Sequence, residues 1–92
     1  MKVLSNSEVK EKLKEINGWK LKGNRIEKVY RFKQYMDGIA FVNKLAELAE
    51  KEEHHPDIEI IYTTVTVALT THDAGGITNY DIRMAKKIIQ LS

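Results

Sequence analysis

The chain has 92 residues, 42% hydrophobic and 30% charged, which predicts one small soluble domain, residues 1–92, with a modest core. The formal net charge is only +2 and lysines are interspersed with glutamates, so the charge pattern predicts no nucleic-acid partner. The lack of cysteine excludes disulfides and thiolate chemistry, and without an apolar run typical of signal peptides or bilayer spans we expect a cytoplasmic protein with no membrane partner.

The N-terminal segment is predicted to form a short helix. Ser5 and Glu8 stand in the spacing of a capping box, in which each side chain binds the backbone amide of the other residue. The next apolar residues recur at steps of four and three and share one helical face: Val9, Leu13 and Ile16. Asn17-Gly18 should end this helix, because both residues tolerate the left-handed conformation common after a helix.

A β-hairpin is predicted next. Residues 19–22 alternate apolar and polar side chains, as a half-buried strand does, and residues 25–32 form a second strand candidate. Gly23-Asn24 supplies a two-residue turn between them. Lys28 interrupts the alternation of the second strand, because it falls on the face of its apolar residues.

The strongest helical pattern covers residues 35–53, where apolar side chains recur at helical spacing with charged residues on the opposite side. Pro56 lacks an amide hydrogen and disfavours helical geometry at His55 before it. We therefore expect the helix to end near His54 and to place two adjacent histidines at its exit.

Two further strands are predicted from the β-branched residues in 58–65 and 67–71, with a turn at Tyr62-Thr63-Thr64. Residues 72–76, which contain His72 and two glycines, should form a loop.

Thr78 and Asp81 form a second capping-box pair ahead of an apolar helical stripe. The resulting order is helix, two strands, helix, two strands, helix (α-β-β-α-β-β-α). Hairpins flanked by helices predict an α+β fold, a four-stranded antiparallel sheet with helices packed on one face.

The three histidines are the best candidates for chemistry. Histidine exchanges protons near neutral pH, and His72 opens a loop at the end of a strand, a common place for functional residues. Glu50 lies four residues before His54, on the same helical face, where it could orient that histidine. If the last two strands are neighbours, the loop and the helix exit could converge.

Other interpretations stay open at this point. A histidine near a helix C-terminus can simply interact with the helix dipole, and Asp81 can serve only as a cap. Trp19 can be a core residue, a subunit contact or a ligand platform. A zinc site is a weaker alternative, because adjacent histidines project in opposite directions in extended backbone and no metalloprotease motif is present.

One spaced set of residues extends through the second half of the chain. It consists of an acidic residue, three positions, His-His-Pro, an aromatic residue, a histidine and an aspartate, read here as Glu50, His54-His55-Pro56, Tyr62, His72 and Asp81. This pattern resembles the pterin-4a-carbinolamine dehydratases. The resemblance runs over residues 19–89.

The resemblance implies a fold, an activity and site residues. Members have a four-stranded antiparallel sheet with helices on one side, form homodimers or homotetramers, and convert 4a-hydroxytetrahydropterin to quinonoid dihydropterin and water without a cofactor or metal. By resemblance, the candidate catalytic residues are His54 and His72, for proton transfer, and His55, which contacts the pterin. The candidate substrate-binding residues are Glu50, Glu53, Asp81 and Trp19.

The sequence departs from relatives at two positions. Tyr80 stands where some relatives carry a basic residue, so substrate contacts there are expected to differ. Ile58 replaces an aromatic residue of animal relatives, so a partner surface known from them is not carried over. The alternative function is that of a pterin-binding or protein-interaction module with the same fold. A further alternative is an enzyme that acts on another pterin.

Overall fold

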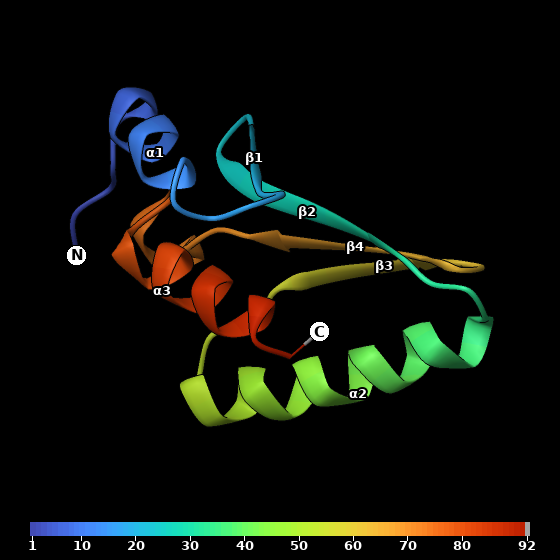
Figure 1. The fold of residues 1–92 in the computed structure, drawn as a ribbon. Coiled ribbons are helices and arrows are strands. Elements are labelled where there is room, and N and C mark those ends of the chain that lie inside the picture. Colours follow the sequence, from blue (N-terminus) through green and yellow to red (C-terminus); the bar gives the residue numbers. More distant parts are fainter. Residues whose placement is uncertain (92) are drawn as a thin grey trace.

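The computed structural model describes residues 1–91, so Ser92, the last residue of the expected domain, lies outside the described residues. Its elements follow the predicted order, which is confirmed (Figure 1). The elements are α1 (Asn6–Leu13), β1 (Lys20–Lys22), β2 (Arg25–Arg31), α2 (Tyr35–Glu52), β3 (Asp57–Ile61), β4 (Thr64–Leu69), the 3₁₀ helix η1 (His72–Ala74) and α3 (Asn79–Ile89).

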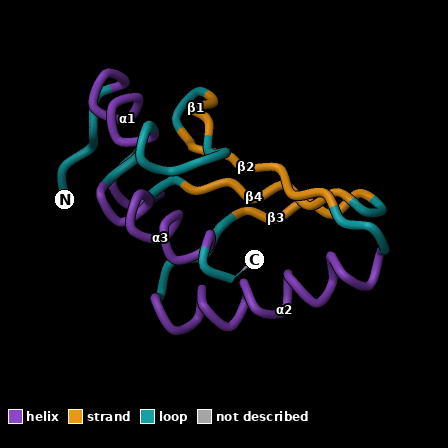
Figure 2. The backbone as a smooth tube through the Cα atoms, in the orientation of Figure 1, coloured by secondary structure: helices purple, strands orange, loops and turns teal. Residues whose placement is uncertain are grey.

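The strands form one antiparallel sheet in the order β1-β2-β4-β3, so the last two strands are neighbours. One face of the sheet carries the core, and its buried strand residues are Ile26, Tyr30, Val65, Val67 and Leu69. Helix α2 runs beneath this face, and α3 lies at the end where α2 meets β3 (Figures 1 and 2). The predicted α+β fold is therefore confirmed.

Lys28 breaks the apolar pattern of β2 without burying an unpaired charge. Its Nζ donates to the backbone oxygen of Asn17 at 3.1 Å and lies 4.9 Å from the centroid of the Tyr30 ring. The aliphatic stem thus covers part of the core while the ammonium group remains bound at its margin.

Predicted boundaries are wrong at the end of the first helix and around the β3–β4 turn, where the strands predicted at 58–65 and 67–71 are Asp57–Ile61 and Thr64–Leu69. Helix α1 ends at Leu13, and consecutive turns carry the chain through Ile16, which stays buried, to the positive φ of Gly18. The β3–β4 turn consists of Tyr62 and Thr63 alone, because Thr64 already pairs with Ile61. Neither shift moves an apolar residue out of the core, so the layers are unaffected.

Both predicted capping boxes are present, at Ser5 with Glu8 and at Thr78 with Asp81. At Glu8 the bonds from the Ser5 amide and the Lys2 ammonium group lower the pKa of the carboxyl to about 2. None of the helices formed by residues 1–91 combines the length and apolar character needed to cross a bilayer.

Candidate active site

The three histidines gather at one end of the molecule. A hollow of about 240 Å³ is lined by seven residues from the α2 exit, the end of β4 and η1: Glu53, His54, His55, Thr70, Thr71, His72 and Asp73. The neighbouring positions of β3 and β4 bring the helix exit and the loop together. The predicted convergence of the histidines is therefore confirmed.

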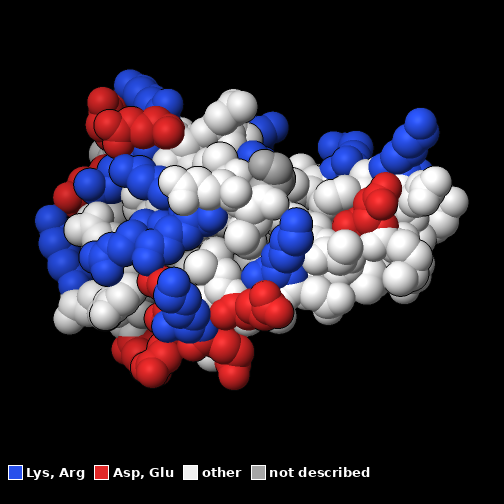
Figure 3. Space-filling model, turned by 60° about the horizontal axis from the view of Figure 1, so that its bottom comes forward, with Lys and Arg blue, Asp and Glu red and all other residues white. Residues whose placement is uncertain are grey.

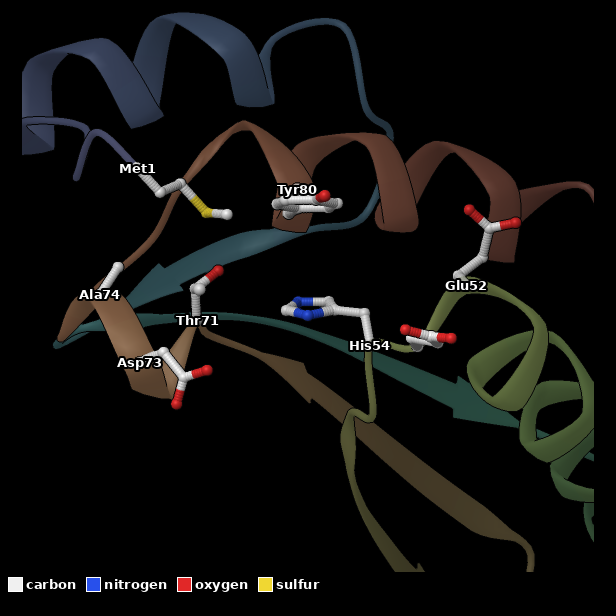
Figure 4. Close-up of a pocket in the computed structure, with 8 residues that line it drawn as sticks. Met1, Glu52, His54, Thr71, Asp73, Ala74 and Tyr80 are labelled. Atoms are coloured by element: carbon white, nitrogen blue, oxygen red, sulfur yellow. The ribbon is translucent and has the colours of Figure 1, made fainter.

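A second, larger hollow of about 620 Å³ adjoins the first (Figure 4). The two hollows share the residues Glu53, His54, Thr71 and Asp73. The other residues that line the larger hollow are Met1, Glu52, Ala74 and Tyr80. His54 thus lines both hollows.

The backbone at the end of α2 sets the direction of His54. Glu53 adopts the left-handed conformation with φ 52° and ψ 38°, which stops the helix, and the His54 amide donates to the oxygen of Ala49 at 3.1 Å. A left-handed residue other than glycine costs free energy and is often found at functional sites. This turn carries the His54 ring off the helix and toward Thr71, as Figure 4 shows.

Asp81 holds the His54 ring from α3. His54 Nε2 lies 2.6 Å from Asp81 Oδ1, and the His54 side chain is only 14% exposed. A carboxylate only accepts hydrogen bonds, so Nε2 carries the hydrogen and Nδ1 is the nitrogen left for a ligand. The same pairing of a carboxylate with one imidazole nitrogen fixes the tautomer of histidines in many active sites.

The side chain of Asp81 has 0% exposure, and both oxygens of its carboxylate have hydrogen-bond partners. Its Oδ2 accepts from the Thr71 hydroxyl at 2.8 Å and from the Thr78 amide at 2.9 Å. The Thr71 and Thr78 hydroxyls are 2.8 Å apart, which links the helix cap to the end of β4. Asp81 is therefore both the helix cap that the sequence predicted and the anchor of His54, a contact that the sequence did not predict.

The Tyr80 ring stacks on one face of the His54 ring. The two rings are nearly parallel, with their centroids 6.0 Å apart and an interplanar angle of 26°. The guanidinium carbon of Arg83 lies 5.2 Å from the Tyr80 centroid. The sequence marked Tyr80 only as a departure from relatives, whereas the structure places it in the wall of the larger hollow.

Glu50 does not orient His54, contrary to the prediction. Its carboxylate pairs instead with Nε2 of His55, and both side chains are exposed. The left-handed turn at Glu53 explains the difference, because it takes His54 off the helical face on which the four-residue spacing was based. An exposed pair of this kind contributes little to stability.

His72 and Asp73 lie in η1, which a bridge between Thr71 and Gly76 closes at its base. The Thr71 amide donates to the Gly76 oxygen at 3.0 Å, and the Gly75 amide donates to the Thr71 oxygen at 3.0 Å. The side chains of His72 and Asp73 are exposed, so a ligand can reach them. Asp73 was not predicted as a site residue, although it lines both hollows.

Trp19 is separate from this group. Its side chain is buried in the core cluster, and Trp19 is not among the described residues that line either hollow. Its indole nitrogen has no hydrogen-bond partner within residues 1–91. Of the predicted site residues, the structure brings together the three histidines, Glu53 and Asp81, with Glu50 at their margin.

One carboxylate beside the site, that of Glu52, is paired with a lysine. Lys87 Nζ lies 2.7 Å from Glu52 Oε1 in the wall of the larger hollow, and this hydrogen bond lowers the pKa of the Glu52 carboxyl. Lys and Arg side chains border Asp and Glu side chains on the face shown in Figure 3. Within residues 1–91, no three His, Cys, Asp or Glu side chains are grouped closely enough to hold a metal ion.

Comparisons with known proteins point to one family. Residues 2–91 match the family model described as pterin 4 alpha carbinolamine dehydratase. A relative from Sulfurisphaera tokodaii, which carries the provisional name pterin-4-alpha-carbinolamine dehydratase, is 48% identical over 99% of this chain and 98% of its own. A relative from Nostoc with the same provisional name is 47% identical over 98% of this chain and 97% of its own.

Two solved structures share the fold. A crystal structure of a transcriptional coactivator/pterin dehydratase from Brucella melitensis superposes with a TM-score of 0.90, at 35% identity and 98% coverage of both chains. A pterin dehydratase-like protein identified as a RuBisCO assembly factor of the alpha-carboxysome superposes with a TM-score of 0.64. It is 26% identical over 79% of this chain and 84% of its own.

Proposed function

The chain belongs to the pterin 4 alpha carbinolamine dehydratase family, and we propose that it dehydrates 4a-hydroxytetrahydropterin by proton transfer between histidines and substrate. One observation carries this proposal: three histidines line a single hollow, and a buried carboxylate fixes the tautomer of one of them. The family membership supports a pterin dehydratase, a lyase, and the geometry supports the assignment of its acid and base.

The reaction needs one proton donor and one proton acceptor. The bond between C4a and the hydroxyl oxygen breaks, and the hydroxyl group leaves as water after it gains a proton. N5 of the ring loses its proton, and the electron pair released forms the C4a–N5 double bond of the quinonoid product. No electrons are exchanged with a second reactant, so general acid–base groups are sufficient.

We assign the two proton transfers to His54 and His72. Nδ1 of His54 is the free nitrogen of a ring held by Asp81, and His72 lies on another segment that lines the same hollow. Two groups on separate elements can act on the leaving hydroxyl and on N5. Which of them is the acid depends on the orientation of the pterin.

The remaining candidate residues have roles in substrate binding, positioning or packing. His55, with Glu50 as its partner, would contact the pterin, and the free carboxylate of Glu53 can accept from the amino and ring N–H groups of the pterin. Asp81 would act through His54, as a positioning residue. For Trp19 we propose a packing role, because its side chain belongs to the core cluster.

Turnover at substoichiometric protein tests this function. The decay of 4a-hydroxytetrahydropterin is followed by stopped-flow absorbance with and without the purified protein. We expect each protein molecule to convert many substrate molecules faster than buffer does. A decay no faster than in buffer would show that the protein is not a dehydratase of this substrate.

A binding module is the second candidate. The similar fold of a RuBisCO assembly factor shows that this architecture serves an assembly role in another protein. Such a module would bind the pterin without accelerating its decay. The turnover measurement, combined with a fluorescence titration of the pterin, therefore separates the two functions.

We also propose that the protein forms a homo-oligomer through β3. This strand lies at the edge of the sheet, all five of its residues are exposed, and two isoleucines, Ile58 and Ile60, lie on the core side of the sheet. An open apolar edge favours pairing with another strand. A two-fold axis beside β3 would pair it with the β3 of a second copy and bury both sets of isoleucines.

Substitution of Ile60 tests this interface. We expect Ile60→Lys to lower the molar mass measured by size exclusion with light scattering to that of the monomer, because the interface would then bury two lysines. Val29→Lys is the matched control, since Val29 is 42% exposed against 38% for Ile60 but lies on the inner strand β2. A monomeric wild type, or an unchanged mass for a folded Ile60→Lys variant, would contradict the proposed interface.

A further inference from the structure

Thr71 lines both hollows of the site, and the proposed acid–base chemistry gives it no role. It precedes η1 directly and is buried. Figure 4 shows it between the His54 ring and the short helix that carries Asp73. A buried hydroxyl group needs hydrogen-bond partners, and the partners of this one indicate what it does.

The hydrogen bonds around Thr71 run in one direction. The Thr78 hydroxyl accepts from the Tyr80 amide at 3.2 Å, and the Thr71 hydroxyl donates its one hydrogen to Asp81 Oδ2 at 2.8 Å. The hydrogen between the two hydroxyls, which are 2.8 Å apart, therefore comes from Thr78. Donated hydrogens thus lead from the cap of α3, through Thr71, to the carboxylate that holds His54.

The chain of hydrogen bonds is shielded from water, since Thr78 and Asp81 are fully buried. In such surroundings a hydrogen bond to a charged group is strong, and loss of one partner is costly. Oδ2 of Asp81 accepts from the Thr71 hydroxyl and from the Thr78 amide. Without the hydroxyl the carboxylate could turn about its last side-chain bond, and Oδ1 would then move away from His54 Nε2.

The main chain of Thr71 shapes the loop that carries His72. The Thr71 carbonyl oxygen accepts from the amides of Ala74 and Gly75, each at 3.0 Å. The Thr71 amide donates to the Gly76 oxygen at 3.0 Å, which closes η1 at its base. One residue therefore holds both proposed proton-transfer groups, one through its main chain and the other through its side chain.

On the basis of the proposed function, we propose that Thr71 is a positioning residue that fixes His54 and His72 relative to each other. Its hydroxyl acts on His54 through Asp81 and not by contact with the pterin. Dehydration needs both proton transfers on one bound molecule, so the rate depends on the geometry of the two groups.

Thr71→Val tests this role, because valine keeps the shape of the side chain but lacks the hydroxyl. We expect it to lower kcat about tenfold with little change in KM, as loss of one hydrogen bond to a charged group would. Thr71→Ser, which keeps the hydroxyl, should restore most of kcat. Thr66→Val is the matched control on β4, and it should change kcat by less than about twofold, because Thr66 pairs with Val29 and Glu59 on the outer face of the sheet.

Two double variants show through which histidine the hydroxyl acts, with the protein in excess over 4a-hydroxytetrahydropterin. In the His54→Gln background Thr71→Val should cause little further loss of rate, because the two side chains act as one unit. In the His72→Ala background it should still lower the rate about tenfold, since that histidine lies outside the chain of donors. Equal losses in the wild-type and His54→Gln backgrounds would overturn the proposal.

A merely structural role would give a different result. Thr71→Val would then lower the free energy of unfolding in urea and leave kcat of the folded protein unchanged, which would also overturn the proposal. If Thr71→Val does not fold, Thr71→Cys replaces it, because its thiol is a weak donor, and kcat should fall between the values of Thr71→Ser and His54→Gln. A wild type without turnover would instead reject the proposed function itself.

Discussion

His54→Ala is expected to lower the rate constant for dehydration by at least about tenfold, within the range of roughly 10²–10⁴ that a general acid or base contributes. The substitution removes an imidazole ring whose Nε2 is bound by Asp81 and whose Nδ1 is left for the substrate. Stopped-flow measurements at saturating substrate report the loss in kcat directly.

His54→Ala also removes a donor from a buried carboxylate, which would lower stability as well as activity. His54→Gln is the matched control, because the glutamine side chain can place an N–H near the position of Nε2 but exchanges no proton at neutral pH. We expect His54→Gln to keep most of the wild-type stability in urea unfolding and still to lose the rate. A fully active His54→Gln variant would contradict the assigned role of His54.

Asp81→Asn is expected to lower the free energy of unfolding by about 2–4 kcal/mol, since breaking a buried, hydrogen-bonded charge leaves donors unpaired. Asp81 is fully buried and accepts from Thr71, Thr78 and His54. The amide group of asparagine would turn a donor toward one of these three donors. Urea unfolding monitored by circular dichroism measures the difference.

The same variant should lose activity beyond what its stability explains. If Asp81 acts by holding His54, Asp81→Asn will lower kcat in the wild-type background by about tenfold or more, as loss of an orienting carboxylate does. In the His54→Gln background the additional loss should be small, because the two residues act as one unit. Equal losses in both backgrounds would show that Asp81 does not act through His54.

Much of the fold follows from local patterns. The second helix, the hairpin turn at Gly23-Asn24 and both capping boxes were predicted from spacing alone. The end of α1 was misplaced because Ile16 keeps helical spacing while it lies in a turn that packs on the same core. Residue spacing does not distinguish a helix from a series of turns that buries the same side chain.

The site was predictable in its members but not in its contacts. The histidines were identified from their chemistry and from the family pattern, whereas the partner of His54 lies 27 residues away on another helix. Local spacing favoured Glu50 as that partner, and the left-handed Glu53 made this wrong. Contacts between α2 and α3 depend on tertiary packing, which also places Tyr80 against the His54 ring.

The central claim is that the chain dehydrates 4a-hydroxytetrahydropterin with His54 and His72. The most direct test measures the decay of this substrate with the wild type and with a folded variant that carries both His54→Gln and His72→Ala. We expect catalytic turnover by the wild type, and a decay close to that in buffer with the variant although it still binds pterin. An equal acceleration by both proteins, or none by the wild type, would contradict the claim.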